Sequence, residues 1–326
     1  MNEPPKKSKI ILIAGDGAAG HEQQSRALCA GMGFDFETIH VEYPSKWRKL
    51  LSYAFDRLGV SLGALYRLEG AELRPGKFAA VVGTGSTAFY PARVIARKLG
   101  VPAIAVLSPR GYRLAGFDCI LSPGFDRLPR RKNVVATPVN LTQVGDDFYA
   151  RGVADFEARH ARDPGARSVG VIIGGENHFT RMDAGGMRKQ LEAVFSATEG
   201  MARWVTTSRR TPTDVERVVR ETAFDYKLVF SEDPFNPIPA FVMLCDTLFV
   251  TSDSTGMISE AVTRGGARVE ILMNLRKPGT KYGRFIGDLE RMGCVHCFEG
   301  RLGDARAKVD LKPVLRRVAE VAGLQP

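Results

Sequence analysis

A short apolar run that ends in a hydroxyl-rich turn and leads directly into a helical pattern most constrains how this chain can fold. Its clearest instance is residues 247–272, with the sequence TLFVTSDSTGMISEAVTRGGARVEIL. The run 248–250 is apolar and partly β-branched, as in a buried parallel strand. A helical pattern begins near Met257, and the glycine pair 265–266 can end it before a second strand follows. We therefore predict one strand–helix–strand unit here.

The same succession recurs along the chain. Further strands are predicted at residues 9–14, 78–82, 102–107, 117–121, 133–136, 169–173 and 203–207. Alternating strands and helices are typical of a doubly wound sheet, and 326 residues are enough for two domains. The predicted fold class is α/β, with two Rossmann-like doubly wound domains facing across a cleft. The predicted bounds are an N-terminal domain at 1–155, a connection within 151–167, a C-terminal domain at 166–302 and a helical tail at 303–326.

The turn after the strand at 248–250 predicts a nucleotide site. Ser254, Thr255 and Gly256 can present backbone N–H groups and hydroxyls beyond the carboxyl end of the strand, where open parallel sheets bind ligands. Glu260, one to two turns into the helix, could accept hydrogen bonds from the two hydroxyls of a ribose. Plain capping is the alternative, because Ser and Thr often cap helices and an early Glu complements the helix dipole.

Two further strand ends are predicted to contribute to the same nucleotide site, through Gly174, Gly175, Ser208, Arg209 and Arg210. Two arginines at the carboxyl end of a strand are suited to clamp a diphosphate. The alternative for Arg209 and Arg210 is an ordinary solvated turn, because arginines are common at protein surfaces.

The strand at 9–14 ends in a glycine-rich turn, GDGAAGH, in which Gly17 and Gly20 allow a substrate to approach the backbone. The spacing G-x-G-x-x-G also occurs in dinucleotide-binding folds. However, no acidic residue ends a convincing second strand about 20 residues further on, the nearest candidate being 38–42. We therefore predict no dinucleotide cofactor.

Asp16 and His21 are the titratable side chains of this turn and the predicted catalytic residues. Either can act as a general base, because histidine titrates near neutral pH and burial can raise the pKa of a carboxylate. The alternatives are that Asp16 caps the following helix and that His21 only covers its first turn.

Positive charge is concentrated in one part of the chain. The formal net charge is +10, and residues 43–113 contain twelve Lys and Arg against three acidic residues. Such a face suits anionic lipid headgroups, a phosphorylated substrate or nucleic acid. Because the sequence has no zinc finger, RNA-recognition signature or basic helix-turn-helix, nucleic acid is not the predicted partner.

Residues 44–68 carry an apolar stripe that includes Trp47, Leu50 and Leu51, with basic residues along its edges. Those edge residues are Lys46, Arg48, Lys49 and Arg57. Such a segment can lie in a membrane interface. The favoured interpretation is a helix that packs its stripe on the sheet and turns a basic face to solvent.

Other features point to an ordinary cytoplasmic protein. No apolar run approaches the ~20 residues needed to cross a bilayer, and the N-terminal tail has no apolar signal-peptide core. Five cysteines, an odd number, do not suggest a disulfide framework. The C-x-x-C motif at 294–297 has no second pair of ligands nearby in sequence, so no metal site is predicted.

An ordered set of motifs resembles the Elm-type mitochondrial fission family over nearly the whole chain. The motifs are GDGAAGH with EQQSRAL, GTGSTAFYPARVIARKLG, SPRGYRLAGFDCILSPGFDRL, NVVATPVNL, GGENHFTRMD, TTSRRTP and NPIPAFVMLCDTLFVTSDSTGMISEA. The bacterial branch of that family is regarded as glycosyltransferases of the GT-B architecture, and its plant members are linked to recruiting a dynamin-type protein for organelle division. One departure is Phe125-Asp126, where relatives carry a His before the Asp, which puts an acid–base role of this segment in doubt.

The layout is also similar to the lipid-linked N-acetylglucosaminyltransferase of peptidoglycan synthesis. That resemblance implies that Gly17, Gly20 and His21 face the acceptor and the diphosphate. It also implies that Ser254, Thr255, Gly256 and Glu260 hold the nucleotide.

The combined prediction is a GT-B glycosyltransferase that moves a sugar from a nucleotide-diphosphate donor to a membrane-associated glycolipid or a cell-envelope saccharide. No cofactor is predicted; the nucleotide sugar is the donor substrate, and the resemblance favours a uridine nucleotide. The protein is expected in the cytoplasm and peripheral to the inner face of the membrane, with an anionic membrane surface as a partner. Two alternatives stay open: a non-catalytic peripheral membrane adaptor that retains the fold, and a nucleotide-sugar epimerase. Inversion at the sugar is the favoured stereochemistry.

Overall fold

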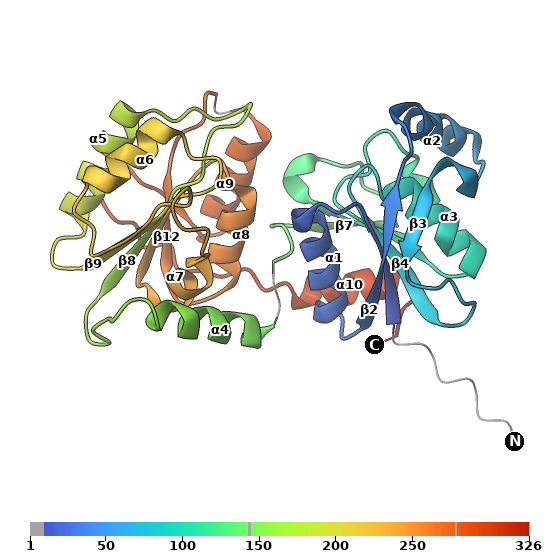
Figure 1. Cartoon of the computed structure of the whole chain (residues 1–326), viewed down its shortest axis with the longest axis horizontal. Helices are drawn as coiled ribbons and strands as arrows, with labels where there is room; N and C mark the ends of the chain where they lie inside the picture. The colour runs from blue at the N-terminus through green and yellow to red at the C-terminus, as the bar shows by residue number, and fades with distance from the viewer. Residues whose placement is uncertain (1–9, 143–144, 278, 326) are drawn as a thin grey trace, which may run out of the picture. The chain divides into compact units, whose positions relative to one another are not determined.

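The computed structural model, which describes residues 10–142, 145–277 and 279–325, divides the chain into two units (Figure 1). Unit 1 comprises the residues up to 144 together with those from 311 onward, and unit 2 comprises Gly145–Asp310. Each unit has its own largely parallel sheet with helices on both faces. The predicted α/β class with two Rossmann-like units is confirmed.

The sheet of unit 1 has the strand order β3-β2-β1-β4-β5-β6-β7, and its neighbouring strands are parallel except β2 and β3. Its strands are β1 (Ile10–Gly15), β2 (Asp35–Glu42), β3 (Arg67–Gly70), β4 (Phe78–Thr84), β5 (Ala103–Val106), β6 (Cys119–Pro123) and β7 (Val134–Thr137). Its helices are α1 (Ala19–Gly31), α2 (Lys46–Leu58), α3 (Phe89–Leu99) and α10 (Lys312–Val321). The strand order reverses between β1 and β4, so the carboxyl ends of these two strands form the switch point at which such sheets bind ligands.

Strand β1 shows why the sheet of unit 1 is buried on both faces. Ile11 and Ile13 pack with residues of α1 and α10, whereas Leu12 and Ala14 pack with residues of α3. Successive side chains of a strand point to opposite faces. An apolar residue at every position is therefore what a strand with helices on both sides requires.

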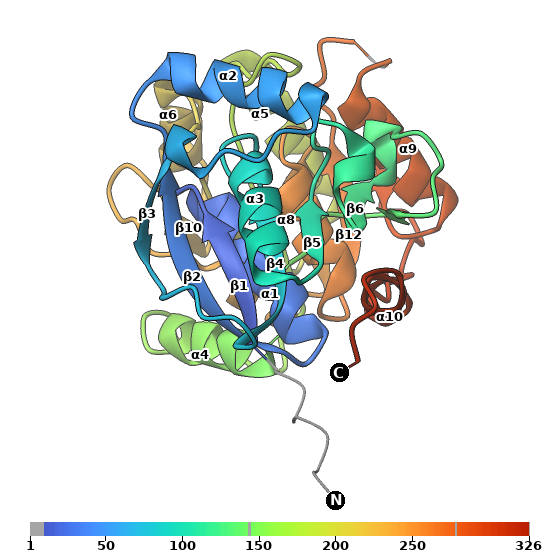
Figure 2. The ribbon, with the colours of Figure 1, turned by 90° about the vertical axis from the view of Figure 1, so that its right-hand side faces the viewer.

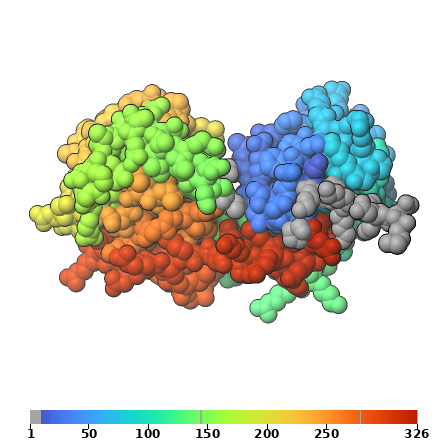
Figure 3. Space-filling view, turned by 90° about the horizontal axis from the view of Figure 1, so that it is seen from below, coloured from blue at the N-terminus to red at the C-terminus, as the bar shows by residue number. Residues whose placement is uncertain are grey.

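The C-terminal helix α10 belongs to unit 1. Leu315 and Val318 are 4% and 0% exposed and pack with core residues of α1 and of the sheet. Figure 3 shows the red atoms of the C-terminal segment against the blue atoms of the N-terminal segment. The structure thus differs from the separate tail expected at 303–326, because the buried side of α10 completes the core of unit 1.

The sheet of unit 2 has the order β10-β9-β8-β11-β12-β13, and all its strands are parallel. Its strands are β8 (Ser168–Ile172), β9 (Ala202–Thr206), β10 (Tyr226–Leu228), β11 (Thr247–Thr251), β12 (Arg268–Leu272) and β13 (His296–Cys297). Its helices are α4 (Asp146–Glu157), α5 (Ala184–Ala197), α6 (Thr213–Glu221), α7 (Ile238–Leu244), α8 (Thr255–Thr263) and α9 (Lys281–Arg291). Here the strand order reverses between β8 and β11, which defines the switch point of this unit.

Helix α4 begins unit 2 earlier than the sequence suggested. Phe156 of α4 lies 5.0 Å from the ring of Trp204 on β9 and 5.7 Å from that of Phe241 on α7, between ring centroids. These contacts bury Phe156 completely. The chain therefore divides at residues 144 and 145 rather than within the connection expected at 151–167, because α4 is a packed helix of unit 2.

Helix α2 is oriented opposite to the favoured expectation. Its buried residues are Ser52 and Asp56, both 0% exposed, whereas Trp47 is 76% exposed. Asp56 forms a buried ion pair with Arg93, and Ser52 lies 3.0 Å from the hydroxyl of Tyr112. The expectation that the apolar stripe packs on the sheet is wrong, because the polar side of the helix has the stronger partners. Figure 2 shows α2 at the top of unit 1, above α3.

The structure also bears on two other sequence features, the lack of a long apolar run and the C-x-x-C motif. Within the described residues, no helix is long and apolar enough to cross a membrane. In the C-x-x-C motif, Cys294 is buried and Cys297 lies on β13. Among the described residues, no group of three or more His, Cys, Asp or Glu side chains is arranged to hold a metal ion.

Candidate functional site

Three strand-end loops of unit 2 meet at its switch point, and we call this place the unit 2 junction (residues 173–177, 207–211 and 251–256). Asp253, which follows β11, lies at its centre and is 1% exposed. Its carboxylate accepts hydrogen bonds from the Gly175 N–H at 2.9 Å and from the Arg210 guanidinium at 3.1 Å. The Thr251 hydroxyl donates to the same carboxylate at 2.6 Å. A single buried acid thus joins the loops that follow β8, β9 and β11.

Glycine is required where the loop after β8 passes Asp253. A Cβ atom on Gly174 would lie 2.2 Å from a carboxylate oxygen of Asp253, which is far inside van der Waals contact. The Gly174 N–H donates to the Thr251 hydroxyl at 2.8 Å. The structure therefore brings the predicted residues Gly174 and Gly175 against β11, and it adds Asp253, which the sequence analysis did not select.

The arginine pair after β9 is divided between two environments. The side chain of Arg210 is 44% exposed, with one edge held by Asp253 and the rest open to solvent. Ser208 shapes this turn, because its hydroxyl accepts from the Arg210 N–H at 3.3 Å. Arg209 is exposed on the same turn. A guanidinium anchored by a buried carboxylate is well placed to bind an anion in a fixed geometry.

The N-terminus of α8 completes the unit 2 junction. Ser254 is the N-cap, and its hydroxyl accepts from the Met257 N–H at 3.3 Å, so the capping interpretation is confirmed for this residue. Thr255 and Gly256 form the first turn of the helix. The backbone carbonyl of Asp253 accepts from the Asn177 side-chain amide at 3.1 Å, which ties the turn to the loop after β8. A helix N-terminus beside a guanidinium favours negative charge.

Glu260 lies further along α8, beside two residues that the sequence analysis did not connect with it. Burial raises the pKa of the Glu260 carboxyl to about 7, although Tyr149 of α4 and Arg264 act in the opposite direction. The Arg264 guanidinium also lies over the Tyr149 ring, 5.3 Å from its centroid. The carboxyl of Glu260 is therefore protonated in part of the molecules at neutral pH. Its predicted contact with a ribose stays a prediction.

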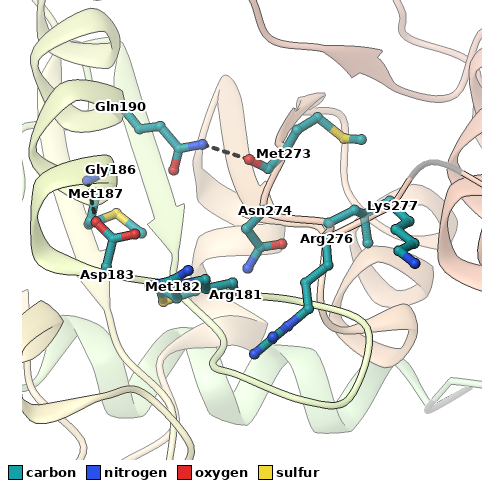
Figure 4. A pocket seen from close by; sticks show the side chains of 11 residues that line it. Arg181, Met182, Asp183, Gly186, Met187, Gln190, Met273, Asn274, Arg276 and Lys277 are labelled. Atoms are coloured by element: carbon teal, nitrogen blue, oxygen red, sulfur yellow. Dashed lines mark hydrogen bonds between the residues drawn. The ribbon is translucent and has the colours of Figure 1, made fainter.

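A cavity of about 600 Å³ opens beside the unit 2 junction, between α5 and the loop after β12 (Figure 4). Arg181, Arg276 and Lys277 bring positive charge to its lining, and Gln190 donates to the Met273 carbonyl at 3.0 Å. The lining also includes Asn274, whose backbone N–H donates to the Ser252 hydroxyl at 2.9 Å. This hydrogen bond connects the lining of the cavity with the turn after β11 in the junction. No local sequence pattern reveals this cavity, because its lining residues come from segments almost a hundred positions apart.

The switch point of unit 1 contains the predicted catalytic pair, with Asp16 on the turn after β1 and His21 in the first turn of α1. The His21 Nδ1 and an Asp16 carboxylate oxygen lie 2.9 Å apart, and the other oxygen accepts from the Ala18 N–H at 3.1 Å. Asp16 raises the pKa of His21 through this hydrogen bond. Although burial acts to raise the pKa of Asp16, the hydrogen bonds from His21 and Ala18 hold it below its usual value. Gly17 on this turn and Gly20 at the start of α1 are both exposed.

The turn after β4 faces this pair, and together the two turns form the unit 1 junction (residues 15–21 and 84–87). Gly85 has a φ of +87°, and a Cβ atom there would lie 2.4 Å from the His21 ring. The Lys49 ammonium donates to the hydroxyls of Ser86 at 3.0 Å and Thr87 at 2.9 Å. Lys49 therefore belongs to this junction, although the sequence analysis placed it on the basic edge of α2. A glycine- and hydroxyl-rich turn was the available sequence signal for Ser86 and Thr87.

Comparison with known proteins adds the family and the fold. The family model described as Mitochondrial fission ELM1 matches residues 19–324. A comparison with curated proteins finds no match. A UDP-N-acetylglucosamine 2-epimerase structure from Listeria monocytogenes is similar, with a TM-score of 0.54 and 11% identity over 97% of this chain and 88% of that chain.

Two further solved structures are similar over most of their length. Arabidopsis thaliana UGT89C1 in complex with UDP has a TM-score of 0.52 and 13% identity, over 96% of this chain and 90% of that chain. A glycosyl transferase family 9 protein from Veillonella parvula has a TM-score of 0.45 and 12% identity, over 98% of this chain and 99% of that chain. The fold of the chain is therefore the GT-B-type fold of glycosyltransferases and UDP-sugar epimerases.

Proposed function

The chain belongs to the mitochondrial fission ELM1 family, and from this premise we propose that it is a glycosyltransferase that uses a nucleotide-diphosphate sugar as donor. The observation that carries the proposal is the unit 2 junction. There a buried carboxylate, Asp253, holds the Arg210 guanidinium next to the N-terminus of α8 at the switch point of the sheet. UDP in the structure of Arabidopsis thaliana UGT89C1, a protein of similar fold, supports a uridine nucleotide.

In this proposal each predicted donor residue has one task. The side chains of Ser208, Arg209 and Arg210 bind the diphosphate. Gly174 and Gly175 donate their N–H groups to Thr251 and Asp253, and so hold the carboxylate that orients Arg210. Ser254, Thr255 and Gly256 direct the positive end of α8 toward it, and Glu260 accepts hydrogen bonds from the ribose. Positive charge fixed before the reaction stabilises the diphosphate as it leaves the sugar.

The unit 1 junction takes the acceptor. His21, oriented by Asp16, removes the proton from the attacking hydroxyl, which is the task of a general base. Gly17 and Gly20 leave the backbone open to a bulky acceptor, and Lys49 provides positive charge for a phosphate group carried by it. We propose a membrane-associated glycolipid or a cell-envelope saccharide as the acceptor, modified in the cytoplasm at the inner face of the membrane.

A second candidate is a non-catalytic peripheral membrane adaptor that retains the fold. It is supported by the description of the matched family and by the exposed apolar side of α2. The two candidates differ in what they require of the unit 2 junction. A glycosyltransferase must bind a nucleotide there and turn it over, whereas an adaptor need not bind one at all.

Calorimetric titration with UDP tests the proposal. Arg210→Gln should weaken UDP binding by ~10–100-fold, because a charge-assisted contact to the diphosphate is lost. The matched control is Arg188→Gln, since Arg188 is 51% exposed on α5 and pairs with Glu221 at 2.8 Å, in an ordinary surface ion pair. Absence of binding by the wild-type protein to every nucleoside diphosphate would favour the adaptor. Binding without release of UDP from any nucleotide sugar, with membrane extracts as acceptors, would also contradict the enzyme.

A further inference from the structure

We infer that the exposed side of α2, together with the segment that follows it, is a docking face for an anionic lipid surface. The docking face consists of Trp47, Leu50, Leu51, Leu58, Val60 and Leu62, surrounded by basic residues. The inference goes beyond the proposed reaction, because it concerns the surface on which the protein works. It also holds for a protein that transfers no sugar.

The exposed apolar side chains of the protein are concentrated in the docking face. Its six side chains are exposed by 76%, 56%, 46%, 75%, 43% and 39% in sequence order. They are six of the ten large hydrophobic side chains that are exposed among the described residues, and they lie within sixteen positions of the chain. Single exposed hydrophobic residues are normal, but a contiguous apolar patch marks an interaction site.

Contacts on the buried side of α2 fix the helix in this orientation. Asp56 pairs with Arg93 in the interior and also accepts from the Arg113 N–H at 2.6 Å. Turning the apolar side of α2 inward would expose these groups and break their contacts. An uncompensated buried charge is very costly, so the helix keeps its polar side on the protein and its apolar side toward solvent.

The charges around the docking face select an anionic surface as its occupant. Between residues 43 and 68 the one acidic residue is Asp56, and it is fully buried. Lys46, Arg48 and Arg57 are exposed on the same helix, and Arg48 also donates to the Ala64 carbonyl at 2.9 Å. An apolar face bordered by cations with no exposed acid is the pattern of helices that lie in the interface of anionic bilayers.

The position of α2 also connects the docking face with the unit 1 junction. Lys49 lies on the same helix and contacts Ser86 and Thr87 of that junction. A protein that rests on a bilayer through Trp47 and Leu50 therefore holds this junction close to the lipid headgroups. A headgroup is where the acceptor hydroxyl of a glycolipid would be found.

The chain contains a natural probe for this inference. It has two tryptophans, of which Trp47 is 76% exposed and Trp204 is 2% exposed. Addition of phosphatidylcholine vesicles that contain phosphatidylglycerol should shift the emission to shorter wavelength at low salt, and brominated acyl chains should quench it. Trp47→Phe should remove both effects, because the remaining Trp204 is inside unit 2. Neutral phosphatidylcholine vesicles should give a much weaker response.

Paired variants separate the apolar and the charged contributions in co-sedimentation with the same vesicles. Leu50→Ser with Leu51→Ser should weaken binding by about tenfold or more, because apolar area is lost from the interface. Lys46→Gln with Arg48→Gln and Arg57→Gln should weaken it to a similar degree at low salt only. Met292→Ser is the control, since Met292 is 45% exposed in unit 2. UDP binding should be unchanged in every variant, so failure of the docking face and failure of the proposed function are distinguishable.

Three results would overturn the inference. The first is the absence of a Trp47 response to anionic vesicles in a protein that is folded by circular dichroism, whether or not it binds UDP. The second is an equal response to neutral and anionic vesicles, which would show that the basic border has no role. The third is an emission shift that depends on protein concentration without lipid, which would assign the face to a second copy of the chain.

Discussion

Asp16 sets the protonation of His21 through the 2.9 Å contact between a carboxylate oxygen and Nδ1. Because that hydrogen bond raises the pKa of His21, the neutral imidazole that serves as a base is present only above the raised pKa. The transfer rate of the wild type should therefore rise with pH through this value. His21→Gln should reduce kcat by ~10²–10⁴-fold with UDP affinity retained, as expected on loss of a general base.

Asp16→Asn gives the sharper test at the residue scale. It removes the charge that raises the pKa of His21, so the acid limb of kcat/KM should move to lower pH while kcat falls. The measurement is UDP release from a nucleotide sugar across the pH range, with the exposed loop variant Asp163→Asn as control. An acid limb that stays in place would show that another group acts as the base.

At the scale of elements, the fully buried anchors of α2 are polar, Ser52 and Asp56, and Tyr53 and Phe55 pack beside them. Asp56→Asn should lower the free energy of unfolding by about 3–5 kcal/mol, because the buried guanidinium of Arg93 then has no carboxylate to pair with. Leu51→Ala on the same helix should change it by less than about 0.5 kcal/mol, because this side chain is 46% exposed. Urea unfolding measures both values. Equal effects of the two changes would contradict the orientation of α2 described here.

The contact between α8 and α4 makes stability depend on pH. The Glu260 pKa of about 7 lies above its value in an unfolded chain, so the folded state binds more protons and loses stability as pH rises from about 4.5 through 7. Glu260→Gln cannot ionise and should avoid this loss. Relative to wild type it should be stabilised at pH 8, by an amount on the order of 1–3 kcal/mol, and nearly unchanged at pH 5.

Thermal unfolding at the two pH values measures the effect of Glu260→Gln. Glu192→Gln, on the exposed side of α5, is the matched control and should show no such difference. A stability gain that is equal at pH 5 and pH 8 would mean that the ionisation of Glu260 is not its cause.

At the scale of the whole molecule, the last helix completes the first unit. Ending the chain at Asp310 removes Leu315 and Val318 from the core of unit 1, and each buried side chain of this kind contributes about 1.5–3 kcal/mol. Hydrogen exchange should then show protection lost across unit 1 and kept in unit 2. The control is Arg316→Ala, on the exposed side of α10, which should change neither unit. Equal loss of protection in both units would contradict the assignment of α10 to unit 1.

Much of the architecture could be predicted from local patterns in the sequence. The apolar runs at 248–250 and 169–173 correspond to β11 and β8, and the helix expected after Ser254 is α8. The G-x-G-x-x-G turn also placed Asp16 and His21 together, because they are five positions apart on one turn. Strands, turns and helix starts depend on a few neighbouring residues, so a single sequence contains the information that specifies them.

The sequence by itself thus determined the alternation of strands and helices and the turns that could bind a ligand. Only the tertiary structure decided which side of α2 is buried, that Asp253 joins three loops, that Lys49 binds the turn after β4, and that α10 completes unit 1. Each of these depends on a partner far away in the chain, such as Arg93 for Asp56 or Arg210 for Asp253. The free energy of a buried charge is set by that partner and not by the neighbours of the residue in sequence.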